Sequence, residues 1–137
     1  MANVKVCCAV LFQNNKVLAV QRAETMSNPL KWEFPGGKIK AGEKEEECIK
    51  REIKEELGLT IKAKERLESN VHPYSESLQI ELIPFLCEIT DGSLELAEHK
   101  AHLWLNPFEL ETLDWSEADL PIVKTLASRA QNSNLSL

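Results

Sequence analysis

Glutamate is concentrated in one stretch of the chain, residues 37–59, which reads GKIKAGEKEEECIKREIKEELGL. No glycine or proline interrupts residues 43–57, and apolar residues recur there at every fourth position, at Ile49, Ile53 and Leu57. That period predicts a helix with one buried stripe. At about 100° per residue, Glu52 and Glu56 lie about 40° apart and flank this stripe. Carboxylates so placed repel each other, and a hard divalent cation such as Mg²⁺ or Mn²⁺ between them would reverse the repulsion.

A second interpretation of this helix is an ordinary solvated face, because Glu- and Lys-rich helices are common and their charges pair at i and i+4. The composition favours that interpretation, but the spacing does not. The stretch matches the Nudix box at every specified position, namely Gly37, Glu43, Arg51-Glu52-Ile53, Glu55-Glu56 and Gly58-Leu59. At average amino-acid usage, such a match arises by chance with a probability on the order of 10⁻⁹ to 10⁻¹⁰. The sequence therefore resembles the Nudix hydrolases, which cleave nucleoside diphosphates linked to another moiety with Mg²⁺ or Mn²⁺.

The resemblance implies a fold and a set of roles for the box. The fold is an α/β/α sandwich, a mixed sheet between helices, in which the box forms a loop–helix–loop. The glutamates that match the metal-binding and base positions are Glu52, Glu55 and Glu56. The catalytic residues implied are Glu52 and Glu55 together with Arg51, which would hold a glutamate in place by a charge-assisted hydrogen bond. Gly37 and Gly58 would permit tight turns before and after the helix, and Glu43 would support the cluster.

Features outside the box resemble the MutT-like branch of the family. The run EFPGGK leads into the box, and its expected substrate contacts are Glu33, Phe34, Pro35, Gly36 and Lys38. The resemblance makes the Gly36 carbonyl a metal ligand and makes Arg22 and Lys38 phosphate contacts, although either cation alone could simply lie on the surface. Glu98, six residues before Trp104, matches an additional metal-binding glutamate, with a solvated loop residue as the alternative. Phe34 could line a base pocket or belong to the core.

Asp119 stands directly before Leu120-Pro121, where the MutT 8-oxoguanine hydrolase has asparagine. An asparagine offers a donor and an acceptor to a purine edge, whereas an ionised aspartate only accepts. With aspartate at this position, the sequence resembles relatives that act on CTP and 5-methyl-dCTP. Asp119 is therefore expected to contact the base, by accepting from the amino group of cytosine or of a purine. It could also cap the terminal helix, because aspartate is a favoured N-cap.

Most elements that must position these residues are predicted strands. Apolar and β-branched runs predict strands at residues 4–13, 17–23, 32–37, 60–71, 78–89 and 101–107. Residues 23–31 read as a loop, residues 106–110 as one helical turn and residues 116–130 as a terminal helix. Pro84 predicts that its strand lies at a sheet edge or contains a bulge. Strands around one long helix suit an α/β or α+β sandwich.

The chain has 137 residues and a formal net charge of -6. That length suits a single domain, expected over residues 1–130 and followed by a flexible tail at 131–137. The negative charge argues against a nucleic-acid polymer or an anionic membrane as a partner. Without an apolar run of membrane-spanning length or a secretory signal, a cytoplasmic location is expected. The four cysteines and three histidines have no metal or redox spacing, so reduced thiols and ordinary polar histidines are expected.

The expected reaction is hydrolysis of a (deoxy)nucleoside triphosphate to the monophosphate and pyrophosphate with Mg²⁺, or Mn²⁺ in its place. The first expected substrate is 8-oxo-dGTP, with CTP or 5-methyl-dCTP as the alternative. A nucleoside diphosphate sugar or dinucleotide polyphosphate is a further candidate substrate. A non-catalytic nucleotide-binding module is also conceivable, but the intact box argues against it. The protein is expected to be a monomer or a homodimer.

Overall fold

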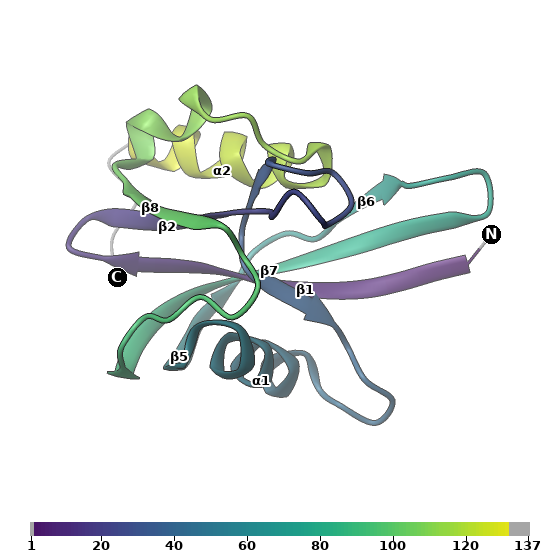
Figure 1. The fold of residues 1–137 in the computed structure, drawn as a ribbon, viewed down its shortest axis with the longest axis horizontal. Helices are drawn as coiled ribbons and strands as arrows, with labels where there is room; N and C mark the ends of the chain where they lie inside the picture. Colours follow the sequence, from purple (N-terminus) through teal and green to yellow (C-terminus); the bar gives the residue numbers. More distant parts are fainter. Residues whose placement is uncertain (1, 132–137) are drawn as a thin grey trace.

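The computed structural model describes residues 2–131, which form a mixed β-sheet with helices on both of its faces (Figure 1). The strands are β1 (Ala2–Gln13), β2 (Lys16–Gln21), β3 (Trp32–Glu33), β4 (Gly36–Lys38), β5 (Leu59–Arg66), β6 (Asn70–Pro73), β7 (Leu78–Gly92) and β8 (Ala101–Leu105). The α-helices are α1 (Glu45–Leu57) and α2 (Leu120–Gln131), and the 3-10 helices are η1 (Pro107–Thr112) and η2 (Glu117–Asp119). The predicted α/β/α arrangement is confirmed.

Strands β1 and β7 run parallel at the centre of the sheet, from the pair Ala2↔Leu78 to the pair Leu11↔Cys87. Strands β5 and β6 pair antiparallel with β7 on its other side. β4 pairs with the middle of β1, and β2 follows the end of β1 and pairs with β3 and β8. Parallel neighbours need a crossover connection, and the segment that contains α1 supplies it. This crossover brings α1 across the sheet beside β4.

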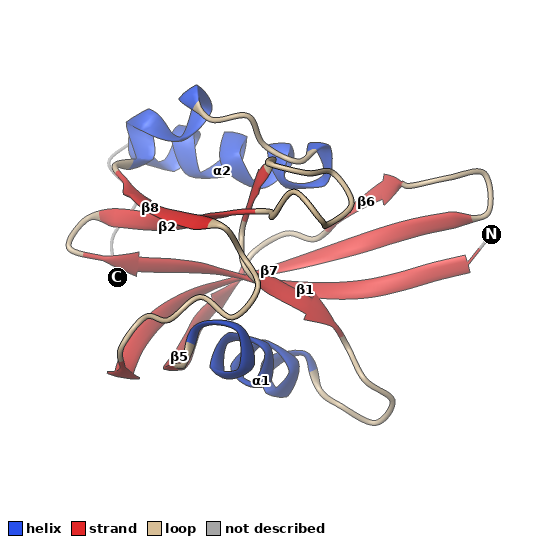
Figure 2. Ribbon diagram, in the orientation of Figure 1, coloured by secondary structure: helices blue, strands red, loops and turns tan. Residues whose placement is uncertain are grey.

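The two faces of the sheet bury two separate apolar cores. Along β1, Cys7 enters the core that contains the buried α1 side chains, Cys48, Ile49, Ile53 and Leu57. The next residue, Cys8, enters the core that contains Ile122, Val123 and Leu126 of α2. Figure 2 shows the two helices on opposite sides of the strands. Adjacent strand residues point to opposite faces, and all four cysteines, each within the described residues, are buried free thiols.

Pro84 does not mark an edge strand. It lies within β7, opposite Cys8 of the neighbouring β1. On the other side of β7, β6 pairs only as far as Leu82 and β5 begins to pair at Phe85. Pro84 falls in the gap between these two partners, where its missing N–H breaks no ladder bond and its carbonyl accepts from Leu67 N at 2.9 Å. The edge alternative was wrong because one long strand pairs with two short partners. The bulge alternative fits better, because the pairing of β7 with β5 shifts register between Thr60 and Ile61 and between Ala63 and Glu65.

The last elements lie close to their predicted places. η1 is the expected helical turn, and α2 is the expected terminal helix with Pro121 in its first turn, where a missing N–H costs little. Gln131 is the last residue of α2, so the first residue of the expected tail is helical. Residues 132–137, the rest of that tail, lie outside the described residues. Within residues 2–131, no helix combines the length and the apolar character needed to cross a membrane.

Candidate active site

Helix α1 is joined to the sheet by turns that contain glycine. β4 carries Gly37 against the helix, and a Cβ at this position would overlap the carboxylate of Glu52. Only glycine therefore allows the strand and this side chain to lie so close together. After the helix, Gly58 has a φ of 71°, the left-handed conformation that commonly ends a helix. The structure thus has a turn at Gly58 after the helix, as predicted. The predicted turn at Gly37 was wrong, because Gly37 lies within β4 and pairs with Cys7, and the chain turns before α1 at Gly42, where φ is 78°.

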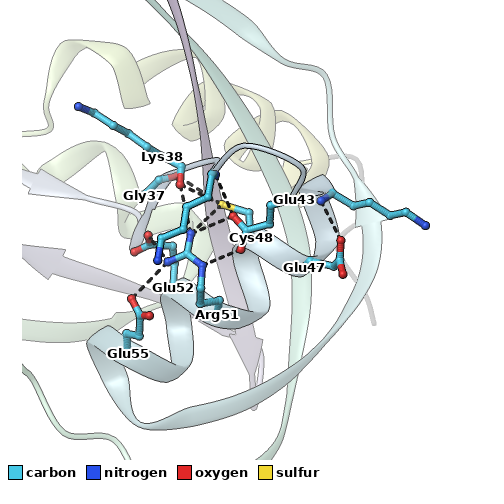
Figure 3. Close-up of polar contacts among 10 residues, drawn as sticks. Gly37, Lys38, Glu43, Glu47, Cys48, Arg51, Glu52 and Glu55 are labelled. Atoms are coloured by element: carbon cyan, nitrogen blue, oxygen red, sulfur yellow. Dashed lines mark hydrogen bonds and ion pairs between the residues drawn. The ribbon is translucent and has the colours of Figure 1, made fainter.

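Arg51 binds three glutamates on and before α1 (Figure 3). Its Nε and Nη2 atoms donate to the Glu43 carboxylate at 2.6 and 2.9 Å. Its Nη1 atom donates to Glu52 at 2.9 Å and to Glu55 at 3.2 Å. The two-pronged contact lowers the pKa of Glu43 to about 2 and raises the pKa of Arg51. Arg51 therefore holds Glu52 and Glu55 in fixed positions, which fits its expected role.

The carboxylate of Glu56 lies outside this arginine network. Burial raises the pKa of Glu56 to about 8, and the nearby carboxylates of Glu52, Glu33 and Glu98 raise it too, while the amide of Gly36 opposes the shift. The Oε2 atom of Glu56 is buried and has no hydrogen-bond partner among the described residues. A divalent cation would neutralise these carboxylates and give the unpartnered oxygen a ligand to bind. The residues therefore fit a hard metal ion.

The predicted metal ligands come from three segments of the chain: Glu52, Glu55 and Glu56 from α1, Gly36 from β4, and Glu98 from the loop between β7 and β8. This loop lies against the end of α1, where Ala97 N donates to the carbonyl of Glu56 at 3.0 Å. No three His, Cys, Asp or Glu side chains within residues 2–131 are gathered as a metal cage. Glu52 and Glu55 bind Arg51 instead, and Glu56 is the carboxylate with the free buried oxygen.

A cavity of about 910 Å³ lies beside β4 and α1, within the size range typical of ligand sites. Nine of the predicted site residues line it: Arg22, Glu33, Phe34, Gly36, Gly37, Lys38, Glu56, Glu98 and Asp119. An apolar part of the lining comes from β1, β6 and β7, with Val6, Pro73, Leu78, Ile80 and Leu82. The other predicted residues do not line it: Pro35, Glu43, Arg51, Glu52, Glu55 and Gly58. A polyanion and an apolar ring could therefore share this cavity.

Glu33 links Arg22 to a histidine that the sequence interpretation left as an ordinary polar residue. Arg22 Nη1 donates to Glu33 Oε1 at 2.9 Å, and His99 Nε2 lies 2.8 Å from Glu33 Oε2. Arg22 also donates to the carbonyl and the hydroxyl of Ser27. His99 is buried, and its Nδ1 atom has no partner within residues 2–131. Only its position directly after Glu98 could have drawn attention to it.

Phe34 belongs to the core, as one alternative had it, and it also lines the cavity. Its ring stacks on Trp115, with centroids 4.7 Å apart and planes at 28°. Its backbone N–H donates to Asp119 Oδ2 at 2.9 Å. Burial raises the pKa of Asp119 to about 8, although the bond from Phe34 N–H opposes this shift. In the described chain the Asp119 carboxylate binds Phe34 and no amide of α2, so the capping prediction was wrong.

Comparison with known proteins identifies the family. Residues 1–126 match the NUDIX domain. The chain belongs to the Nudix hydrolase family. It is 30% identical over 131 residues to the CTP pyrophosphohydrolase of Escherichia coli, a match that covers 95% of this chain and 96% of the relative. It is 30% identical over 114 residues to the 8-oxo-dGTP diphosphatase of the same organism, covering 83% and 88%. The solution structure of the Escherichia coli ORF135 protein has a TM-score of 0.84 at 26% identity and covers 99% of this chain and 96% of that one.

Membership of the Nudix family confirms the resemblance inferred from the glutamate spacing, including its likeness to MutT-type proteins. Nudix hydrolases act on nucleotide substrates and generally use divalent metal ions. The acidic residues of α1 and the cavity beside them are consistent with both properties.

Proposed function

We propose that this Nudix hydrolase converts (deoxy)nucleoside triphosphates to the monophosphate and pyrophosphate, with Mg²⁺ as its cofactor and Mn²⁺ as a substitute. The observation that supports this most strongly is the buried, unpartnered oxygen of Glu56 in a cavity that also has an apolar wall. The acidic residues suit a cation that carries a polyphosphate, and the apolar wall suits a nucleobase.

The proposed metal ligands are the carboxylates of Glu52, Glu55, Glu56 and Glu98 and the carbonyl of Gly36. A bound divalent ion neutralises phosphate charge and lowers the pKa of the attacking water. Arg51 orients Glu52 and Glu55 through its Nη1 atom. One of these two glutamates would accept the proton of that water on a carboxylate oxygen.

The proposed phosphate contacts are Lys38 and Arg22, which both line the cavity. Lys38 is exposed, so its ammonium group can move to meet a phosphate. Arg22 is already bound to Glu33 and Ser27, so we propose that it acts from a fixed position. Pro35, whose carbonyl accepts from Ala9 N at 2.8 Å, keeps the strand connection before Gly36 in place.

For the base, we propose a site formed by Phe34 and Asp119. The first candidate substrate is 8-oxo-dGTP. The enzyme would then remove an oxidised precursor of DNA from the nucleotide pool. CTP or 5-methyl-dCTP is the second candidate, supported by Asp119 and by the match to the CTP pyrophosphohydrolase of Escherichia coli. An ionised Asp119 would accept from the cytosine amino group, and a protonated one could also donate to a purine.

A panel of nucleotides tests this proposal. We expect pyrophosphate release with Mg²⁺, and a kcat/KM for 8-oxo-dGTP well above that for dGTP. A preference for CTP or 5-methyl-dCTP over 8-oxo-dGTP would replace the first candidate by the second. ADP-ribose and a nucleoside diphosphate sugar serve as controls, because faster cleavage of either would contradict the proposed reaction.

A further inference from the structure

The hydroxyl group of Ser116 is buried, lines the cavity and has no hydrogen-bond partner. The residue is 8% exposed, and its Oγ atom is one of four buried side-chain atoms without a partner in the described chain. Three of these four atoms belong to residues that line the same cavity: Glu56, His99 and Ser116. A buried hydroxyl without a partner destabilises a fold, so a position that retains one suggests a missing ligand group.

The local structure does not use this hydroxyl. Ser116 is the N-cap residue of η2, a position where a serine side chain normally accepts an amide hydrogen bond, but it makes no such bond here. Its backbone is held on both sides: Ser116 N donates to Trp32 O at 2.8 Å, and Asp119 N donates to Ser116 O at 3.0 Å. The hydroxyl is therefore fixed in place by its main chain while its own bonding capacity stays free.

Ser116 lies beside the groups that we assign to the base. The bond between Asp119 N and Ser116 O ties the two residues together, and both line the cavity with Phe34. Phe34 stacks on Trp115, the residue directly before Ser116. Only one oxygen of Asp119 binds Phe34 N, which leaves the other without a protein partner in residues 2–131. A hydroxyl can donate or accept by rotation, so it complements a carboxyl group in either protonation state.

We propose that Ser116 is a specificity-determining residue whose hydroxyl hydrogen-bonds the edge of the nucleobase next to Asp119. This inference rests on the proposed function, because it takes the apolar part of the cavity as the base site. A base that satisfies the hydroxyl gains one hydrogen bond, and a base that presents a mismatched or apolar edge leaves the hydroxyl buried and unpaired. Sites of this kind discriminate strongly between similar ligands.

Ser116→Ala removes the hydroxyl and little else, so it separates a ligand contact from a structural role. We expect its Tm without ligand to equal or exceed that of the wild type, since the lost group has no protein partner. We expect kcat/KM for the preferred nucleotide to fall by about 10-fold or more, mainly through KM, and the preference among bases to shrink by a similar factor. Ser93→Ala, which removes an exposed hydroxyl outside the cavity, should change none of these quantities.

Two measurements keep the test decisive: kcat/KM for 8-oxo-dGTP, dGTP, CTP and UTP, and calorimetric affinities for the four corresponding monophosphates without metal. Turnover with an unchanged base preference in Ser116→Ala would overturn the inference and leave the proposed reaction standing. A lower Tm with uniformly lower activity would overturn it in favour of a structural role. Monophosphate binding that depends on Ser116, without turnover of any triphosphate, would support the inference and contradict the hydrolase. No binding and no turnover would contradict both.

Discussion

Replacing Asp119 by asparagine should make the protein more stable, and the gain should grow with pH. Asp119 is 5% exposed, and burial raises its pKa from 3.8 to about 8. The asparagine side chain has nearly the same shape and can still accept the hydrogen bond from Phe34 N–H, which is 2.9 Å long in the wild type. The substitution therefore removes the titrating group and keeps its main contact.

The sign and size of the effect follow from proton binding. In the unfolded chain this carboxyl releases its proton near pH 3.8, whereas in the folded protein it keeps the proton until about pH 8. Between these values the folded state binds one proton more than the unfolded state, so the free energy of unfolding falls by about 1.4 kcal/mol per pH unit as pH rises. Asparagine does not titrate, so from pH 5 to pH 7 the stability of Asp119→Asn relative to the wild type should rise by about 3 kcal/mol.

Urea denaturation at pH 5, 6 and 7, followed by tryptophan fluorescence, measures this difference directly, and other titrating groups cancel between the two proteins. Glu111→Gln is a matched control, because it removes an exposed carboxylate on η1 and should give a difference that does not change with pH. If the difference between Asp119→Asn and the wild type were also constant from pH 5 to 7, the carboxyl would be ionised in the folded protein, and the assignment of a buried, protonated Asp119 would be refuted.

Three further predictions concern the residues around α1. Arg51→Lys keeps the charge, but a lysine cannot make two hydrogen bonds to Glu43 and reach Glu52 as well. We therefore expect kcat to fall by about 10-fold or more, with little change in the circular dichroism spectrum. A kcat equal to that of the wild type would contradict the orienting role of Arg51. Gly37→Ala would displace the Glu52 carboxylate and should lower kcat by about 100-fold. Gly42→Ala is its control, since its Cβ meets open space at a φ of 78°: it should lower Tm and leave kcat unchanged. In thermal scans, Mg²⁺ should raise the Tm of the wild type. Glu56→Gln should have a higher Tm than the wild type without metal, and its Tm should not rise when Mg²⁺ is added. An equal effect of Mg²⁺ on the Tm of both proteins would exclude Glu56 as a ligand.

The sequence predicted the helix and the turn at its end because their determinants are local. The buried stripe of α1 and the left-handed turn at Gly58 each depend on residues within a few positions of one another. The same locality made most strands readable from apolar runs and turn residues, although the predicted strands at 32–37 and 60–71 are each divided into two in the structure. It did not reveal that β7 pairs with both β6 and β5, which is why the edge alternative for Pro84 was wrong.

The parts of the site that escaped prediction depend on residues far apart in the chain. His99 meets Glu33 across 66 positions, and Asp119 meets Phe34 N across 85. No spacing rule covers such pairs, because the sheet and the loops decide them together. The burial that raises the pKa of Asp119 and leaves the Ser116 hydroxyl unpartnered is likewise a property of the packed molecule. The reaction class could therefore be expected from the box, while the surroundings of the proposed base site could be described only from the structure.

Product analysis tests the central claim most directly. The purified chain is incubated with Mg²⁺ and 8-oxo-dGTP or CTP, and the products are separated by ion-exchange chromatography, with Glu52→Gln as the matched variant. We predict equal amounts of nucleoside monophosphate and pyrophosphate from the wild type, no reaction without a divalent ion, and little product from the variant. Release of inorganic phosphate and a nucleoside diphosphate, or equal turnover by Glu52→Gln, would contradict the proposed reaction at this site.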